Sequence, residues 1–317
     1  MLDIVGKRFW FLIISGVFTL LCVIFLAAFG LRMGIEFSSG SMITLSFDQK
    51  VEQSDLTGEL ASLGYTNAIV QSTGAGDFFI RTRGLSGEDK TALESGLTAR
   101  FGSLTVREFD SVSPMIATET ARNALIAVII ASIGILLYIT WAFRRMPSPF
   151  RYGTCGIIAL VVNVLVVLGV FAVLGAMLGW EINLMFITGV LAVIGYSVNN
   201  TVVIFDRIRE NLKRGVSPRF ELIVNNSLVE SLSRSFNTSL TTLIVVMALL
   251  LFVGATIQNF AVVLLIGIVF GTFSSLYIAP PLLVVWENGE WGKFVKRPSL
   301  VRPLARIIPP LGKRRSS

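Results

Sequence analysis

Histidine is absent from this chain of 317 residues, and cysteine occurs only twice. Because histidine is the commonest metal ligand and titrates near neutral pH, its absence excludes histidine metal centres and histidine proton relays. Cys22 and Cys155 each lie inside a long apolar stretch, which favours small buried fillers over a disulfide framework or a metal site. We therefore expect no metal site and no cofactor.

Charged residues are also scarce, since they make up 15% of the chain whereas 53% of the residues are hydrophobic. This composition is typical of membrane proteins. A helix needs about 20 apolar residues to cross the bilayer core. Six stretches of about this length predict transmembrane helices at residues 9–31, 124–143, 153–178, 184–205, 238–254 and 260–286.

The positions of Lys and Arg predict the orientation of these helices, because short positively charged loops stay in the cytoplasm. Such residues precede the first stretch, join the second to the third, follow the fourth and crowd the C-terminal tail. Both termini are therefore expected in the cytoplasm. The net charge of +7 comes largely from this side, so we expect no nucleic-acid binding. The tail is interpreted as a solvated topology anchor, with a membrane-facing or ribosome-facing surface as the alternative.

These patterns divide the chain into four parts. They are a first transmembrane helix (1–31), an exported domain with more acids than bases (32–119), a bundle of five transmembrane helices (120–286) and a basic cytoplasmic tail (287–317). The fold class is thus a polytopic α-helical membrane protein with six transmembrane helices and a small α+β domain between the first two.

The exported segment alternates between strand-like and helix-like patterns. Strands are expected at 41–47, 68–72, 78–82 and 104–109, helices at 51–63 and from Ser86, and a hairpin turn at 73–77. The order β-α-β-β-α-β predicts a ferredoxin-like sandwich. The segment has no nucleophile with a base and no phosphate loop, so we expect a contact surface and no enzyme.

Polar residues inside the apolar stretches are the candidate functional residues. Asn163, Asn199 and Asn200 are costly in hydrocarbon unless their amides find partners in protein, a water-filled cavity or an ion path. They are interpreted either as hydrogen bonds between helices or as part of an ion path. The charged run Asp206, Arg207 and Arg209 is either an ion-paired helix end at the interface or a coupling element.

Five features together resemble the SecF branch of the SecD/SecF family in the RND superfamily. They are the six stretches, the single exported loop, the motif from Gly34 to Gly40 (GIEFSSG), the stretch from Gly195 to Asn211 (GYSVNNTVVIFDRIREN) and the basic tail. The resemblance implies a subunit in the bacterial inner (cell) membrane that acts with SecD and the SecYEG channel. Its expected role is to help translocate unfolded preproteins with the energy of an ion gradient such as the proton motive force. YajC and YidC are further expected partners.

The chain departs from this family at the residues that matter for ion passage. Asn200 stands where the family usually has an aspartate that is held to take part in proton passage, and Asn163 stands at a second family aspartate. Arg234 resembles the family's basic residue in the fifth span and is expected to pair with a carboxylate on SecD. In the entrance motif, Glu36 and Ser39 replace an aspartate and a glycine.

Two functions of different class therefore remain open. The chain is either an energy-coupled translocase subunit whose titrating group is supplied by SecD, or a scaffold that stabilises the translocase without passing ions. A small-molecule exporter of the RND type fits less well, because its exported domains are usually larger and occur twice in a chain.

Overall fold

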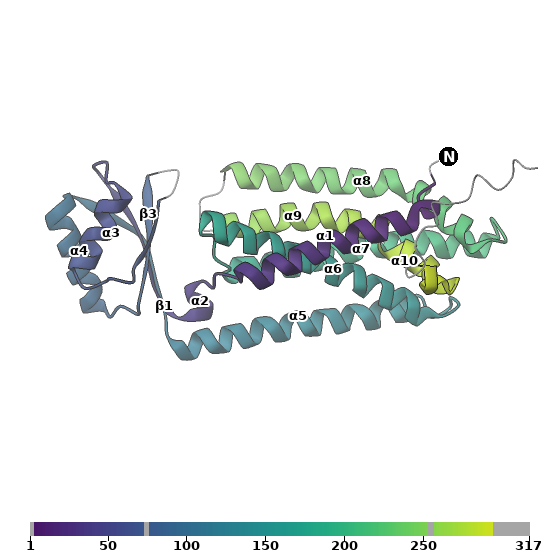
Figure 1. Ribbon diagram of the computed structural model, residues 1–317, viewed down its shortest axis with the longest axis horizontal. Coiled ribbons are helices and arrows are strands. Elements are labelled where there is room, and N and C mark those ends of the chain that lie inside the picture. The colour runs from purple at the N-terminus through teal and green to yellow at the C-terminus, as the bar shows by residue number, and fades with distance from the viewer. Residues whose placement is uncertain (1–2, 73–75, 253–256, 294–317) are drawn as a thin grey trace, which may run out of the picture.

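The computed structural model describes residues 3–72, 76–252 and 257–293. Figure 1 shows a long helical bundle with a small sheet domain at one end and the N-terminus at the other. Within the described residues, six segments are long and apolar enough to cross a membrane: Val5–Phe29, Pro114–Ala142, Pro149–Leu178, Leu184–Arg214, Phe220–Phe252 and Gln258–Glu287. The predicted fold class is confirmed in this respect.

Among the described residues, the bundle consists of six spans, the last of which is divided into two helices; three spans are more enclosed than the other three, which expose apolar side chains. The helices are α1 (Arg8–Phe29), α5 (Pro114–Ala142), α6 (Pro149–Leu178), α7 (Leu184–Arg214), α8 (Phe220–Phe252), α9 (Gln258–Tyr277) and the short α10 (Ala279–Glu287). Leu20 on α1, Leu125 on α5 and Ile244 on α8 are among the exposed apolar residues. Lipid tails are as apolar as these side chains, so they can face the bilayer without cost. The centre is formed by α6, α7 and α9.

Helix ends differ from the predicted spans: α7 continues past residue 205 to Arg214, and α8 begins at Phe220 and not at residue 238. Helix α5 begins at Pro114, with the Ser113 hydroxyl accepting a bond from the Ile116 amide, so the predicted domain boundary at 119/120 falls inside a helix. The last predicted span is two helices, since α9 ends at Tyr277 and α10 begins at Ala279. Two prolines, Pro280 and Pro281, follow this break, and proline fits only the first turn of a helix because it has no backbone N–H.

The sheet domain has the predicted β-α-β-β-α-β order. It comprises β1 (Gly40–Phe47), α3 (Gln53–Ser62), β2 (Ile69–Ser72), β3 (Asp77–Thr82), α4 (Gly87–Phe101) and β4 (Leu104–Val112), and residues 73–75 of the predicted turn lie outside the described residues. The strands form one antiparallel sheet in the order β2-β3-β1-β4, which is the ferredoxin-like arrangement. Helices α3 and α4 cover the face that points away from the bundle (Figure 1), and Ile43, Leu45, Ile80 and Leu97 fill the space between.

Polar contacts attach the sheet domain to the bundle. The Arg81 guanidinium lies 2.7 Å from the Glu181 carboxylate in the α6–α7 loop and also donates to the carbonyl of Met33. The Gln71 amide donates to the Gly179 carbonyl at 2.8 Å. A single turn of helix, α2 (Ile35–Ser38), connects α1 to β1 beside this junction. The domain is thus fixed at the end of the bundle where α6 ends and α7 begins.

The predicted basic tail lies outside the described residues from position 294 onward. The described first part of that tail includes the turn Glu290–Lys293, which returns to the end of the bundle where α1 begins. Arg8 bonds to Glu290 there at 2.6 Å. The described N-terminal and C-terminal residues therefore lie at the same end of the bundle, opposite the sheet domain.

Candidate functional site

Asn163 on α6 and Asn200 on α7 are both enclosed in the bundle. Their exposed fractions are 1% and 3%. The Asn163 Nδ2 donates to the Gly267 carbonyl on α9 at 3.3 Å, whereas its Oδ1 finds no hydrogen-bond partner among the described residues. The Asn200 Nδ2 is also without a partner there. Each amide therefore has an unpaired buried atom among the described residues, which is costly for buried polar groups.

Glycine allows these helices to come close enough for the amide of Asn163 to reach α9. A side-chain carbon added at Gly271 would lie 3.0 Å from the Asn163 Nδ2 and 3.3 Å from the Ser197 Cβ. Position 271 thus has room for no larger residue without displacement of its neighbours. Asn163 and the turn of α7 that carries Ser197 and Asn200 consequently meet around one segment of α9.

Hydroxyl groups complete the polar layer around these asparagines. The Tyr196 hydroxyl bonds to the Ser239 Oγ at 3.0 Å, and the Ser239 and Thr272 hydroxyls lie 2.6 Å apart, which connects α7, α8 and α9. The Thr201 hydroxyl donates to the Ser275 Oγ at 2.9 Å. The groups named here are hydroxyls and amides. The layer can exchange hydrogen bonds, but the described residues that form it include no carboxylate and no amine.

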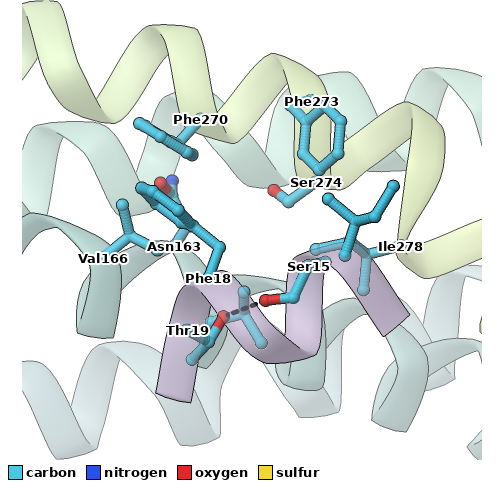
Figure 2. A pocket seen from close by; sticks show the side chains of 11 residues that line it. Ser15, Phe18, Thr19, Asn163, Val166, Phe270, Phe273, Ser274 and Ile278 are labelled. Carbon is cyan, nitrogen blue, oxygen red and sulfur yellow. Dashed lines mark hydrogen bonds between the residues drawn. The ribbon is translucent and has the colours of Figure 1, made fainter. Parts of the chain in front are cut away.

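A cavity of about 200 Å³ lies on the α1 side of Asn163. Figure 2 shows Asn163 beside it, with Ser15 and Thr19 of α1 and Ser274 of α9 on its other walls. The Thr19 hydroxyl donates to the Ser15 carbonyl at 2.8 Å, and the remaining walls are apolar, with Phe270 among them. The space next to Asn163 is therefore bounded mainly by hydrocarbon.

Two predicted site residues lie away from this layer. Asn199 is exposed, whereas the adjacent Asn200 is enclosed. Arg234 is exposed on α8, and the described part of the chain offers it no ion pair. The structure thus separates the adjacent asparagines into an inner and an outer residue.

The charged run at the end of α7 forms ion pairs at the bundle end that carries the termini. Arg209 lies 2.7 Å from Asp206, and its guanidinium is 5.9 Å from the ring of Phe143. Arg207 bonds to Glu210 and, at 2.6 Å, to Glu230 on α8. These contacts join α7 to α8 and leave no charge of the run inside the polar layer.

Sequence reasoning missed a row of serines on α8. Ser227, Ser231, Ser235 and Ser239 recur every four residues and are all buried. This spacing places them on one helix face, and it could have been read from the sequence. Ser227 accepts a bond from Asn211 of α7 at 3.0 Å, and Ser239 bonds to Tyr196, so the row faces α7.

The described residues include no group of three or more acidic, histidine or cysteine side chains that could hold a metal ion. Outside the bundle, burial raises the pKa of Glu36, and the nearby carboxylates of Glu181 and Asp110 raise it further, while bonds from the backbone amides of Glu36 and Leu184 oppose this. The charge of Glu36 is therefore harder to keep than that of a glutamate in water. Glu36 lies at the junction with the sheet domain.

The chain is similar to known protein-export membrane proteins. The model of the family "Protein export membrane protein SecD/SecF, C-terminal" matches residues 92–289, and the model of the SecD/SecF GG motif matches residues 24–51. The chain is 43% identical to the protein translocase subunit SecF of Thermobaculum terrenum, with 94% of this chain and 98% of the relative covered. It is 40% identical to that of Anaerolinea thermophila over the same shares.

Longer relatives contain a matching part. The protein translocase subunit SecDF of Bacillus subtilis is 35% identical, with 92% of this chain and 39% of the relative covered. The crystal structure of SecDF from Thermus thermophilus, described as a translocon-associated membrane protein, matches with a TM-score of 0.81 and 31% identity over 90% of this chain. A second SecDF structure, in a super-membrane-facing form, gives a TM-score of 0.66. The chain spans about two fifths of the length of these two solved chains.

Proposed function

The chain belongs to the SecD/SecF family of protein-export membrane proteins, and from this membership we propose that it is the SecF subunit of a Sec protein translocase. In this proposal it works with a separate SecD subunit on the SecYEG channel and promotes the translocation of unfolded preproteins, with YajC and YidC as further partners. The observation that carries the proposal is the match to SecF subunits over nearly the whole length of both chains.

The longer SecDF relatives support a SecD partner, because this chain matches only one part of them. The exposed face of α8 supports it too. Arg234 is exposed on α8, whose large exposed apolar residues include Phe236 and Leu240. A guanidinium that faces lipid is costly unless a carboxylate pairs with it. A carboxylate on SecD would supply this pair.

The proposed orientation places both termini in the cytoplasm of a bacterial cell and the sheet domain outside its inner membrane. It is supported by the positive residues near the ends of α5 and α7 and by the excess of acids in the sheet domain. Cysteines introduced at Ser86 and at Ser217, after removal of Cys22 and Cys155, are expected to react with an impermeant thiol reagent from opposite sides of the membrane. Reaction of both from one side would contradict the orientation.

We further propose that the layer around Asn200 is the ion-path site of the family in a form that cannot carry a proton by itself. Asn200 is enclosed, its Nδ2 has no partner among the described residues, and the hydroxyl-bearing Tyr196 and Thr201 lie four residues before it and one after it on α7, so we expect hydrogen-bond donors for a carboxylate at this position. An enclosed carboxylate binds protons more readily than one in water. An amide has the same shape without this property.

The experiment compares Asn200→Asp with the neighbouring Asn199→Asp. Inverted vesicles that contain the full-length chain and SecD are tested for preprotein export with and without an imposed proton gradient. We expect Asn200→Asp to raise gradient-dependent export and make it depend on pH, because only this position lies in the layer. Asn199→Asp is the matched control and should leave it unchanged. Asn200→Ala should mainly lower stability, by about 1 kcal/mol for one bond between helices.

The alternative function is a scaffold that stabilises the translocase. It is favoured by the composition of the polar layer, whose described residues include no carboxylate and no amine. If Asn200→Asp leaves the gradient dependence unchanged while Asn200→Ala only loosens the complex, the ion-path proposal is wrong and the scaffold remains.

A further inference from the structure

Helices α7 and α8 each carry a buried polar group that has no partner in the described part of the chain. One is the Asn200 Nδ2, and the other is the Oγ of Ser235, which has an exposed fraction of 2%. An amide N–H can donate to a hydroxyl oxygen, and a hydroxyl can both donate and accept. The two groups are therefore complementary, and each is costly while it stays unpaired.

The contacts on either side show that these residues are at the same level. Helices α7 and α8 run in opposite directions, since the short segment 215–219 joins them. The bond from Tyr196 to Ser239 fixes their register. Asn200 lies four residues after Tyr196 on α7, and Ser235 lies four residues before Ser239 on α8. Four residues span about 6 Å along a helix axis, and the two helices are antiparallel, so Asn200 and Ser235 are displaced from the Tyr196–Ser239 bond by the same distance in the same direction.

A second set of contacts confirms this register on the other side. Arg207 of α7 bonds to Glu230 of α8, and Asn211 bonds to both Glu230 and Ser227. Asn200 and Ser235 therefore lie between two levels at which α7 and α8 are directly bonded.

We propose that Ser235 is the positioning residue for the side chain at position 200. In the assembled membrane protein its hydroxyl accepts a hydrogen bond from the Asn200 amide and holds it toward the centre of α7, α8 and α9. The inference deepens the proposed ion-path site and rests on it only for its role in export, because the contact itself is tested without export.

The first test is a double-mutant cycle on the full-length chain. The melting temperatures of Asn200→Ala, Ser235→Ala and the double variant are measured in detergent. If the two side chains bond to each other, the double variant should melt no lower than the less stable single variant. The matched control is Ser231→Ala, one turn away in the same row. Its decrease in melting temperature should add to the decrease caused by Asn200→Ala. Fully additive losses for Ser235 and Asn200 would overturn the proposal.

The second test separates this proposal from the proposed function. In the Asn200→Asp background a Ser235 hydroxyl would donate to the introduced carboxylate and favour its ionised form. Adding Ser235→Ala should therefore shift the pH midpoint of gradient-dependent export upward by about one unit, a tenfold change in proton affinity. Adding Ser231→Ala should not shift it. If export depends on the gradient but Ser235→Ala does not shift its pH midpoint, only the positioning role of Ser235 is overturned. If the stability losses in the double-mutant cycle are non-additive but export does not depend on the gradient, the contact is supported and the ion-path proposal is contradicted.

Discussion

At the bundle end that carries the termini, the Arg8 guanidinium is enclosed and bonded to two carboxylates, whereas midway along the bundle the amides of Asn163 and Asn200 keep an unpaired atom each. Arg8 lies 2.8 Å from Glu221 and 2.6 Å from Glu290, and its Nη1 donates to the Val5 carbonyl. Asn225 accepts the amides of Ile4 and Val5 beside it. At the end, the buried charge of Arg8 is paired with two carboxylates. In the middle, each buried neutral amide has a polar atom without a partner among the described residues.

The difference between these two regions indicates where the bundle can change its polar contacts. Removal of one member of a buried ion pair leaves the other charge uncompensated, so the end is fixed. A half-satisfied amide loses little when it exchanges partners, and it can accept a new one from water, an ion or a neighbouring chain. The middle of the bundle is therefore the region suited to a functional change, and the end is suited to hold the helices together.

The largest expected effect comes from Arg8→Leu. This change leaves two carboxylates next to an enclosed apolar side chain, and we expect the free energy of unfolding to fall by about 3 kcal/mol. Asn163→Leu, a change of similar kind in the middle, removes one 3.3 Å bond and also one unpaired oxygen. It should change the stability by less than about 1 kcal/mol. Thermal unfolding of the purified variants measures both.

Lys7→Leu is the control for Arg8, since Lys7 is the adjacent cation and is exposed. Its stability should match that of the unmodified chain. Equal decreases in the free energy of unfolding for Arg8→Leu and Asn163→Leu would contradict the difference between the end and the middle of the bundle.

Smaller changes in the free energy of unfolding are expected where the chain enters the sheet domain, and they have opposite signs at two neighbouring positions. Ser39 has φ 64° and ψ 169°, a conformation that favours glycine, and Gly40 has φ 123°. Ser39→Gly should therefore raise the free energy of unfolding by about 1 kcal/mol. Gly40→Ala should lower it by about 2 kcal/mol, because the added carbon would lie 2.6 Å from the Thr82 carbonyl oxygen. Chemical denaturation measures the pair, and the same sign for both changes would rule out this account of the backbone.

The smallest effect concerns pH at the end of the bundle that carries the sheet domain. Burial raises the pKa of Glu36 above its usual value, so the folded chain binds a proton there more readily than the unfolded chain. Stability from this group is fully present below the unfolded pKa of about 4.3 and is lost as the pH rises through the raised folded pKa. The melting temperature of the unmodified chain relative to Glu36→Gln should therefore rise as the pH falls from neutral.

Asp89 provides the opposite case in the same domain. Bonds from the backbone amide and the hydroxyl of Ser86 lower the pKa of Asp89, so its contribution is present at neutral pH and is lost as the pH falls through the lowered value. Relative to Asp89→Asn, the unmodified chain should become less stable on acidification. If both comparisons move in the same direction, burial does not control the titration of Glu36.

Local patterns in the sequence were sufficient for much of this protein. Long apolar runs determined six helices, since backbone groups in lipid must bond within the segment. Alternation along 41–47 and the Ser86–Asp89 capping box determined a strand and a helix start, because both depend on neighbours in the chain. The break at Ile278 was missed although Pro280 and Pro281 signal it, because the apolar run continues through them.

Which polar residue faces which neighbour was decided only by the tertiary structure. Asn199 and Asn200 are identical and adjacent, yet one is exposed and the other enclosed, because successive residues point about 100° apart on a helix and only packing of α8 and α9 selects the inner one. Arg8 is likewise enclosed only because Glu221 and Glu290, more than 200 residues away, fold against it. The sequence determined that polar groups lie in the spans, and the packing of helices distant in the chain decided which of them are satisfied.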